Sequence, residues 1–109
     1  MPRMSTRSSS YAERSMIVEE LTLEVEARDL DGFLEADARI WTAFLAAQPG
    51  FVRKEVWVPA DRPNTVVIMV WWASREQWKA ISDETVASVD REMGEWFRAP
   101  ILREYGVAR

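Results

Sequence analysis

The chain contains no cysteine and no histidine among its 109 residues. Without cysteine there are no disulfides, thiolate metal sites, iron–sulfur clusters or thiol nucleophiles, and a reducing cytoplasm is the expected compartment. Without histidine the commonest metal ligand and the usual general base near neutral pH are both missing. Histidine-ligated haem, zinc hydrolase sites and Ser-His-Asp triads are therefore excluded, and we expect no metal and no cofactor.

Long apolar runs and clustered basic residues are also lacking. The longest apolar run is TVVIMVWW at residues 65–72, which is far too short to cross a bilayer as a helix. Acidic residues outnumber basic ones by 18 to 14, which gives a formal net charge of −4. Because phosphate binding needs concentrated Lys and Arg, we expect neither a membrane nor a nucleic acid as a partner.

What the chain does contain is enough apolar material for one domain. Apolar residues make up 48% and charged residues 29%, which is typical of a globular protein. Residues 1–15 are rich in Ser and Arg and poor in apolar side chains, so they cannot bury enough surface to fold. We expect a flexible tail over 1–15 and one domain over 16–109. For the tail, a targeting segment or a true start at Met16 are the alternatives.

Hydrophobic periodicity predicts the element order β-α-β-β-α-β. Strands are expected at 17–25, 51–58, 65–72 and 101–107, and helices from Asp29 to Gln48, from Ser74 to about Ile81, and from Ser82 onward. Ser74, with Gln77 three residues later, has the spacing of a capping box. The order is that of the ferredoxin-like motif, an α+β fold whose four-stranded antiparallel sheet carries both helices on one face.

The strand at residues 65–72 is apolar on both of its faces. In a ferredoxin-like monomer the helices cover only one of those faces. Burying a Val or Ile side chain is worth about 1.5–3 kcal/mol, so a bare apolar face of this kind marks an interface. We therefore expect two sheets to pack face to face in a homodimer. The alternative is that a loop or the tail covers the face.

Two stretches resemble a known family. They are DARIWTAFLAAQPGFVRKEVWV at 37–58 and VVIMVWWASREQWKAI at 66–81. They are similar to small bacterial proteins with the dimeric α+β barrel fold, which are relatives of the antibiotic-biosynthesis-monooxygenase (ABM) superfamily. The resemblance extends over about residues 16–107. It implies a dimeric barrel, and it leaves the reaction open because that family has no agreed reaction.

The wider superfamily implies several activities. It includes cofactor-free quinone-forming monooxygenases, haem-degrading monooxygenases, lactone isomerases and proteins with no known activity. The haem-degrading members hold iron through a histidine, which this chain lacks. The cofactor-free members use Asn, Trp, Tyr or Arg around an aromatic substrate. Here Asn64 is the sole asparagine, and Glu19 or Glu20 stands where the resemblance implies a catalytic Asn on the first strand.

Two carboxylates are candidates for catalysis. Asp37 lies on the apolar stripe of the first helix, one turn before Trp41, where an ionised side chain is costly unless it is paired. Glu19 interrupts the apolar side of the first strand. Two carboxylates that face one pocket share a proton, which raises one pKa and supplies an acid/base pair without histidine. The alternatives are structural: Asp37 bonded to an indole, a tyrosine or an arginine, and Glu19 paired with Arg53 or Arg103.

Tryptophans and one arginine are candidates for ligand binding. Trp41, Trp57 and one member of the adjacent pair Trp71 and Trp72 are predicted to line a pocket for a flat aromatic ligand. Neighbouring residues of a strand point to opposite sides, so only one member of the pair faces the pocket. Arg53 is predicted to share a face with Phe51 and Trp57, and to clamp a carboxylate or enolate. The alternatives are that the indoles fill the core and that Arg53 protects a sheet edge.

Two functional hypotheses follow. The first is a metal-free and flavin-free monooxygenase or isomerase that acts on a small aromatic or polyketide-like molecule, with Asp37 or Glu19 taking a proton. The second is a non-catalytic dimeric binding or stress-associated protein whose pocket is small or filled. Because ligand sites usually exceed about 300 Å³, the volume of the cavity separates the two hypotheses.

Overall fold

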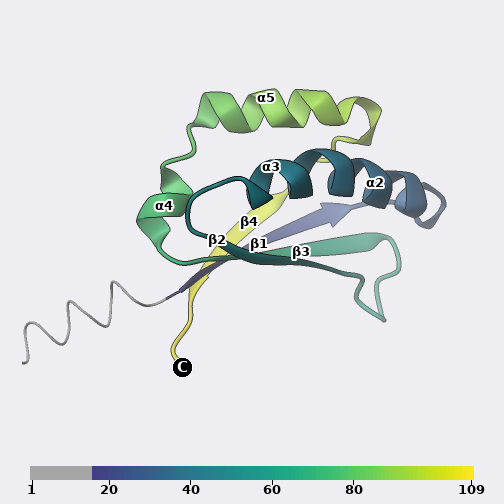
Figure 1. Ribbon diagram of the computed structural model, residues 1–109. Coiled ribbons are helices and arrows are strands. Elements are labelled where there is room, and N and C mark those ends of the chain that lie inside the picture. Colours follow the sequence, from purple (N-terminus) through teal and green to yellow (C-terminus); the bar gives the residue numbers. More distant parts are fainter. Residues whose placement is uncertain (1–15) are drawn as a thin grey trace, which may run out of the picture.

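The strands form one antiparallel sheet in the computed structural model, which describes residues 16–109 (Figure 1). They are β1 (Ile17–Glu24), β2 (Phe51–Trp57), β3 (Thr65–Trp72) and β4 (Ile101–Gly106). Their order across the sheet is β2-β3-β1-β4, and each neighbouring pair is antiparallel. This confirms the predicted α+β, ferredoxin-like fold. The expected tail over 1–15 lies outside the described residues.

Helices cover one face of this sheet (Figure 1). The first helical region is η1 (Ala27–Asp29), α2 (Leu30–Asp37), the π-helical segment η2 (Ala38–Thr42) and α3 (Ala43–Ala46); the second is α4 (Arg75–Lys79), α5 (Asp83–Met93) and η3 (Gly94–Trp96). The predicted cap at Ser74 is present, because its hydroxyl accepts a hydrogen bond from the backbone N–H of Gln77 at 3.2 Å. Ser82, where the next helix was predicted to begin, caps that helix in the same way with Thr85 at 3.1 Å. Within residues 16–109, no helix has both the length and the apolar character needed to cross a membrane.

The two apolar faces of β3 have different surroundings. The residues that point toward the helices and are buried in the core are Val66, Ile68, Val70 and Trp72. Trp71 points to the opposite, helix-free face, so the adjacent tryptophans separate as predicted. Pairing of β1 with β3 sets Glu19 opposite Val70, which places this carboxylate on the helix side of the sheet.

A β-bulge between Phe51 and Arg53 changes the alternation of β2. After the bulge Arg53 pairs with Trp71 and Lys54 pairs with Val70, so Lys54 faces the helices and Arg53 faces away from them. The prediction that Arg53 shares a face with Phe51 is therefore wrong. A bulge adds one residue to one strand, and this shifts every later side chain to the other face.

The helix-free face of the sheet carries exposed aromatic and aliphatic side chains. Trp57, Ile101 and Tyr105 are 46%, 70% and 42% exposed. The guanidinium of Arg53 lies over the ring of Trp71 at 3.9 Å from its centroid, and the edge of Trp57 meets the same indole. These exposed side chains lie on both edge strands, β2 and β4, and within residues 16–109 no helix covers this face (Figure 1).

Candidate active site

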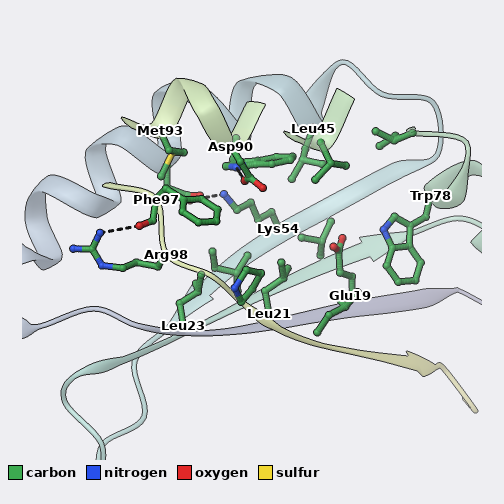
Figure 2. Close-up of a pocket in the computed structure, with 18 of the residues that line it drawn as sticks. Glu19, Leu21, Leu23, Leu45, Lys54, Trp78, Asp90, Met93, Phe97 and Arg98 are labelled. Carbon is green, nitrogen blue, oxygen red and sulfur yellow. Dashed lines mark hydrogen bonds and ion pairs between the residues drawn. The ribbon is translucent and has the colours of Figure 1, made fainter. Parts of the chain in front are cut away.

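A cavity of about 270 Å³ lies between the helix side of the sheet and the helices (Figure 2). Its wall is largely apolar, with Leu21 and Leu23 from β1, Phe33 from α2 and Met93 from α5. The charged side chains that line it are Glu19, Asp37, Lys54, Lys79, Asp83, Asp90 and Arg98. An apolar wall with a few converging polar groups is the usual construction of a small-molecule site, and the volume lies near the lower limit of such sites.

Lys54 and Asp37 form a buried ion pair at this cavity. The Nζ of Lys54 donates to Oδ2 of Asp37 and, at 2.7 Å, to Oγ1 of Thr42. Only 5% of each charged side chain is exposed. Burial lowers the pKa of Lys54, and the attraction of Asp37 opposes that change. Asp37 thus pairs with a cation, and no hydrogen bond within residues 16–109 joins it to Glu19.

The π-helical segment η2 sets the direction of the side chains around this ion pair. A π-helix bonds each residue to the one five positions away, so its turn is wider than that of an α-helix. Asp37 directly precedes the segment, and Trp41 and Thr42 are its last residues. The wider turn lets Asp37 and Thr42 contact the same ammonium while Trp41 reaches α5. Such single π-turns are frequent at functional sites.

Glu19 projects from the sheet into the cavity (Figure 2). The indole Nε1 of Trp72 donates to its Oε1 at 3.2 Å. Burial raises the pKa of Glu19, and the hydrogen bond from Trp72 and the charges of Lys79 and Lys54 partly offset that rise. Glu19 is therefore a carboxylate whose proton affinity is increased inside an apolar cavity, which is the property required of a general base or acid.

Asp90 points into the cavity from α5, on the side opposite the sheet (Figure 2). The indole Nε1 of Trp41 donates to its Oδ1 at 3.1 Å. Burial raises the pKa of Asp90, and the hydrogen bond from Trp41 opposes this. The arrangement repeats that of Glu19 and Trp72 with a second carboxylate and a second indole.

The structure divides the predicted site residues between the two faces of the sheet. Glu19, Asp37, Trp41 and Trp72 line the cavity. The expected placement of Trp57 in the pocket is corrected: Arg53 and Trp57 both contact Trp71 on the helix-free face, and none of the three lines the cavity.

Lys54 and Asp90 belong to the site but were not predicted from the sequence. The signal for Asp90 was present, because this aspartate lies between Val86, Val89 and Met93 on the apolar stripe of α5. The signal for Lys54 was hidden, because simple alternation along β2 assigns it to the other face.

Three acidic groups of the cavity have identified partners: an ammonium holds Asp37, and indole N–H groups hold Glu19 and Asp90. Within residues 16–109, no group of three or more His, Cys, Asp or Glu side chains is arranged to hold a metal ion. The electrostatic partners of the carboxylates are instead the ammonium of Lys54 and the N–H groups of Trp72 and Trp41.

Comparison with known proteins places the chain in a family. The sequence profile described as antibiotic biosynthesis monooxygenase matches residues 16–85, which is more than half of the chain. The chain belongs to the antibiotic biosynthesis monooxygenase family. The matched segment of this family member includes Glu19, Asp37 and Lys54, and it ends before Asp90. Among curated proteins, none matches the sequence.

Solved structures show the same fold at low sequence identity. A monooxygenase from the ActVA-Orf6 gene of Streptomyces coelicolor, in complex with nanaomycin D, has a TM-score of 0.72 and 16% identity over 88% of this chain and 90% of that one. SnoaB, a cofactor-independent oxygenase from Streptomyces nogalater, has a TM-score of 0.60 and 21% identity over 87% and 92%. A conserved protein from Methanosarcina mazei Go1 has a TM-score of 0.66 and 12% identity over 88% and 96%.

Proposed function

We propose that this member of the family is a cofactor-independent monooxygenase that acts on a small aromatic or polyketide-like substrate with an ionisable hydroxyl group. The observation that carries the proposal is Glu19, a carboxylate of raised pKa that projects into a largely apolar cavity. Family membership and the likeness in fold to a cofactor-independent oxygenase support the reaction class. The solved structures share the fold, and the substrate class is argued from the residues that line this cavity.

In the proposed reaction Glu19 takes the proton of the substrate hydroxyl, and the buried ammonium of Lys54 stabilises the negative charge that forms. The electron-rich ring carbon bonds to dioxygen, and Glu19 returns the proton to give a hydroperoxide. Cleavage of the O–O bond, with loss of the hydrogen on that carbon, leaves a carbonyl and releases water. One oxygen atom enters the product and the other leaves as water, so no external reductant is consumed.

Asp37 has a supporting part in this proposal. Its carboxylate holds the ammonium of Lys54 at the cavity wall, together with the hydroxyl of Thr42. A cation fixed in advance stabilises a developing oxyanion without any further reorganisation. Trp41 and Trp72 supply flat apolar walls beside the two indole-bonded carboxylates.

The proposal includes a homodimer formed through the helix-free face of the sheet. The supporting observation is the exposed surface of Trp57, Ile101 and Tyr105, which no helix of the described residues 16–109 covers (Figure 1). Exposed apolar patches of this kind mark interaction sites. A second copy presents the same apolar surface and is therefore a chemically suitable cover.

One observation favours the alternative of a non-catalytic binding protein. The cavity of about 270 Å³ is slightly smaller than the usual lower limit of about 300 Å³ for ligand sites. In that case the family member binds a small apolar molecule without converting it.

The deciding experiment measures oxygen uptake by the EDTA-treated protein with a panel of naphthols and dihydroxynaphthalenes. We expect one quinone and no hydrogen peroxide for each dioxygen consumed.

Glu19→Gln should lower kcat by about 100-fold to 10,000-fold, the usual effect of a lost general base. The matched control is Glu20→Gln, since Glu20 is the next residue and accepts a hydrogen bond from Tyr105 on the other face of the sheet. Ligand binding without oxygen uptake would support the non-catalytic alternative.

A further inference from the structure

We infer that Asp90 is a second substrate-binding residue, which accepts a hydrogen bond from a donor on the edge of the substrate opposite the group held by Glu19. The inference rests on the proposed function and narrows its substrate class. It predicts a flat apolar ring system with hydroxyl or N–H donors on two separate edges.

The position of Asp90 supports this role. Glu19 enters the cavity from the sheet and Asp90 enters it from α5, so the two carboxylates approach the same space from opposite walls (Figure 2). Apolar side chains such as Leu21, Ile68 and Met93 line the wall as well. A ligand that fills the cavity therefore meets carboxylate oxygens at two places, with an apolar surface along its rings.

The unused hydrogen-bond acceptor positions of Asp90 also support a role in substrate binding. Its Oδ1 accepts one hydrogen bond from Trp41, and within residues 16–109 Asp90 makes no ion pair and no other hydrogen bond. A carboxylate has about four acceptor positions on its two oxygens. The capacity that the fold does not use is directed toward the cavity.

The cations near the cavity are engaged elsewhere. Lys54 is bonded to Asp37 and Thr42. Lys79 lies over the ring of Trp78, 3.9 Å from its centroid. Arg98 donates to two backbone carbonyl oxygens, and its guanidinium also lies 3.5 Å from Asp29.

No side chain of the described part of the chain therefore neutralises Asp90. Trp41 satisfies only one of the acceptor positions of this partly desolvated carboxylate, and a donor on the ligand can satisfy another. A ligand with a single donor leaves one of the two carboxylates without its bond. The cavity should therefore bind ligands with two hydrogen-bond donors more tightly than ligands with one.

Anaerobic calorimetric titration tests the inference without turnover, using 1,5-dihydroxynaphthalene and 1-naphthol as probes. The probes differ only in the second hydroxyl group. We expect the wild-type protein to bind the diol about tenfold to a hundredfold more tightly, as is usual for a hydrogen bond to a charged group. Asp90→Leu should bring the two dissociation constants within about twofold of each other. Asp90→Asn, which retains an acceptor for Trp41, should give an intermediate ratio.

The matched control is Glu92→Gln, because Glu92 is an exposed acidic residue of the same helix and does not line the cavity. It should retain the wild-type ratio. A preference for the diol that survives in Asp90→Leu would overturn the inference, as would a diol that does not bind or binds no better than 1-naphthol. Oxygen uptake by the wild-type protein is measured separately. A failed oxygenase hypothesis and a failed role of Asp90 are therefore distinguishable.

Discussion

Lys54 of β2 and Asp37 of α2 form an ion pair that joins the sheet to the first helix, with only 5% of each side chain exposed. The hydroxyl of Thr42 completes the environment of the ammonium. Burial of two charges is unfavourable unless both are paired and hydrogen bonded, and here they are. The pair therefore connects the stability of the fold to the electrostatics of the cavity.

Removing one member of this pair should be strongly destabilising. Lys54→Met leaves the Asp37 carboxylate buried without its cation, and we expect a loss of about 3–5 kcal/mol in the free energy of unfolding. The double variant Lys54→Met/Asp37→Leu should recover most of that loss. Urea denaturation measures both values. As a control, Arg28→Ala breaks the exposed pair with Glu26 and should change stability by less than about 1 kcal/mol. A double variant as unstable as Lys54→Met alone would contradict the expectation.

The stability of the protein should depend on pH through Glu19. Burial raises the pKa of this group, so the folded state binds its proton more tightly than the unfolded state does. Stability from this group is complete below about pH 4.3, the ordinary pKa of glutamate, and is lost as the pH rises through the folded pKa. Glu19→Gln removes the titration and keeps an acceptor for Trp72. Its stability relative to wild type should therefore increase between pH 4 and pH 8, as measured by denaturation at each pH. An unchanged difference would exclude this account.

A methyl group at Gly32 should destabilise the protein, although alanine favours helices. A side chain at Gly32 in α2 would overlap the ring of Trp96. Helix propensity alone predicts a gain of about 1 kcal/mol for Gly32→Ala, whereas overpacking costs about 1–3 kcal/mol. We expect a net loss, together with weaker ligand binding, because Phe97 and Arg98 follow Trp96 and line the cavity.

Gly106→Ala is the control for the glycine experiment. The space around Gly106 is open and its φ is not positive, so the variant should lie within about 0.5 kcal/mol of wild type in thermal and urea unfolding. A gain in stability for Gly32→Ala would show that Trp96 moves aside at little cost.

The proposed dimer predicts a specific effect of charge on the helix-free face. Ile101 is 70% exposed on that face, and Ile101→Glu would place a carboxylate in each half of the interface. We expect the dissociation constant of the dimer to rise at least tenfold, because like charges and buried carboxylates both oppose association. Sedimentation velocity at micromolar concentration measures this, with Ala87→Glu on the exposed side of α5 as the control. A wild-type protein that sediments as a single subunit would disprove the dimer.

Most of the fold was predictable because its signals are local. The caps of α4 and α5 depend on a serine and on residues within three positions of it, and the structure contains both. The alternation of β1 also depends on near neighbours, so the sequence shows that Glu19 interrupts the apolar side of this strand. The face of the sheet to which Glu19 points follows from the pairing with Val70, which the sequence does not fix. Asp37 was recognisable because a charged group on an apolar helix face requires a partner.

The partner of Asp37 was not predictable in the same way. Lys54 reaches it because of a bulge, and a bulge depends on hydrogen bonds to a neighbouring strand rather than on the residue types nearby. The π-turn after Asp37 was also not predictable from the sequence. One additional residue in a helical turn leaves the pattern of residue types almost unchanged. These two irregularities direct Lys54, Thr42 and Trp41, which is why the site was harder to predict than the fold.

The extra residue of β2 also determines which kind of positive charge a bound molecule encounters. A guanidinium stays protonated at every physiological pH, whereas an amine can exchange its proton. Arg53 and Lys54 are adjacent, and a shift of a single position exchanges their orientations. Regular pairing without the bulge would set Val52 opposite Trp71 and Arg53 opposite Val70, and would turn Arg53 inward. The cavity would then contain the permanently charged guanidinium of Arg53 in place of the amine of Lys54, which can exchange its proton.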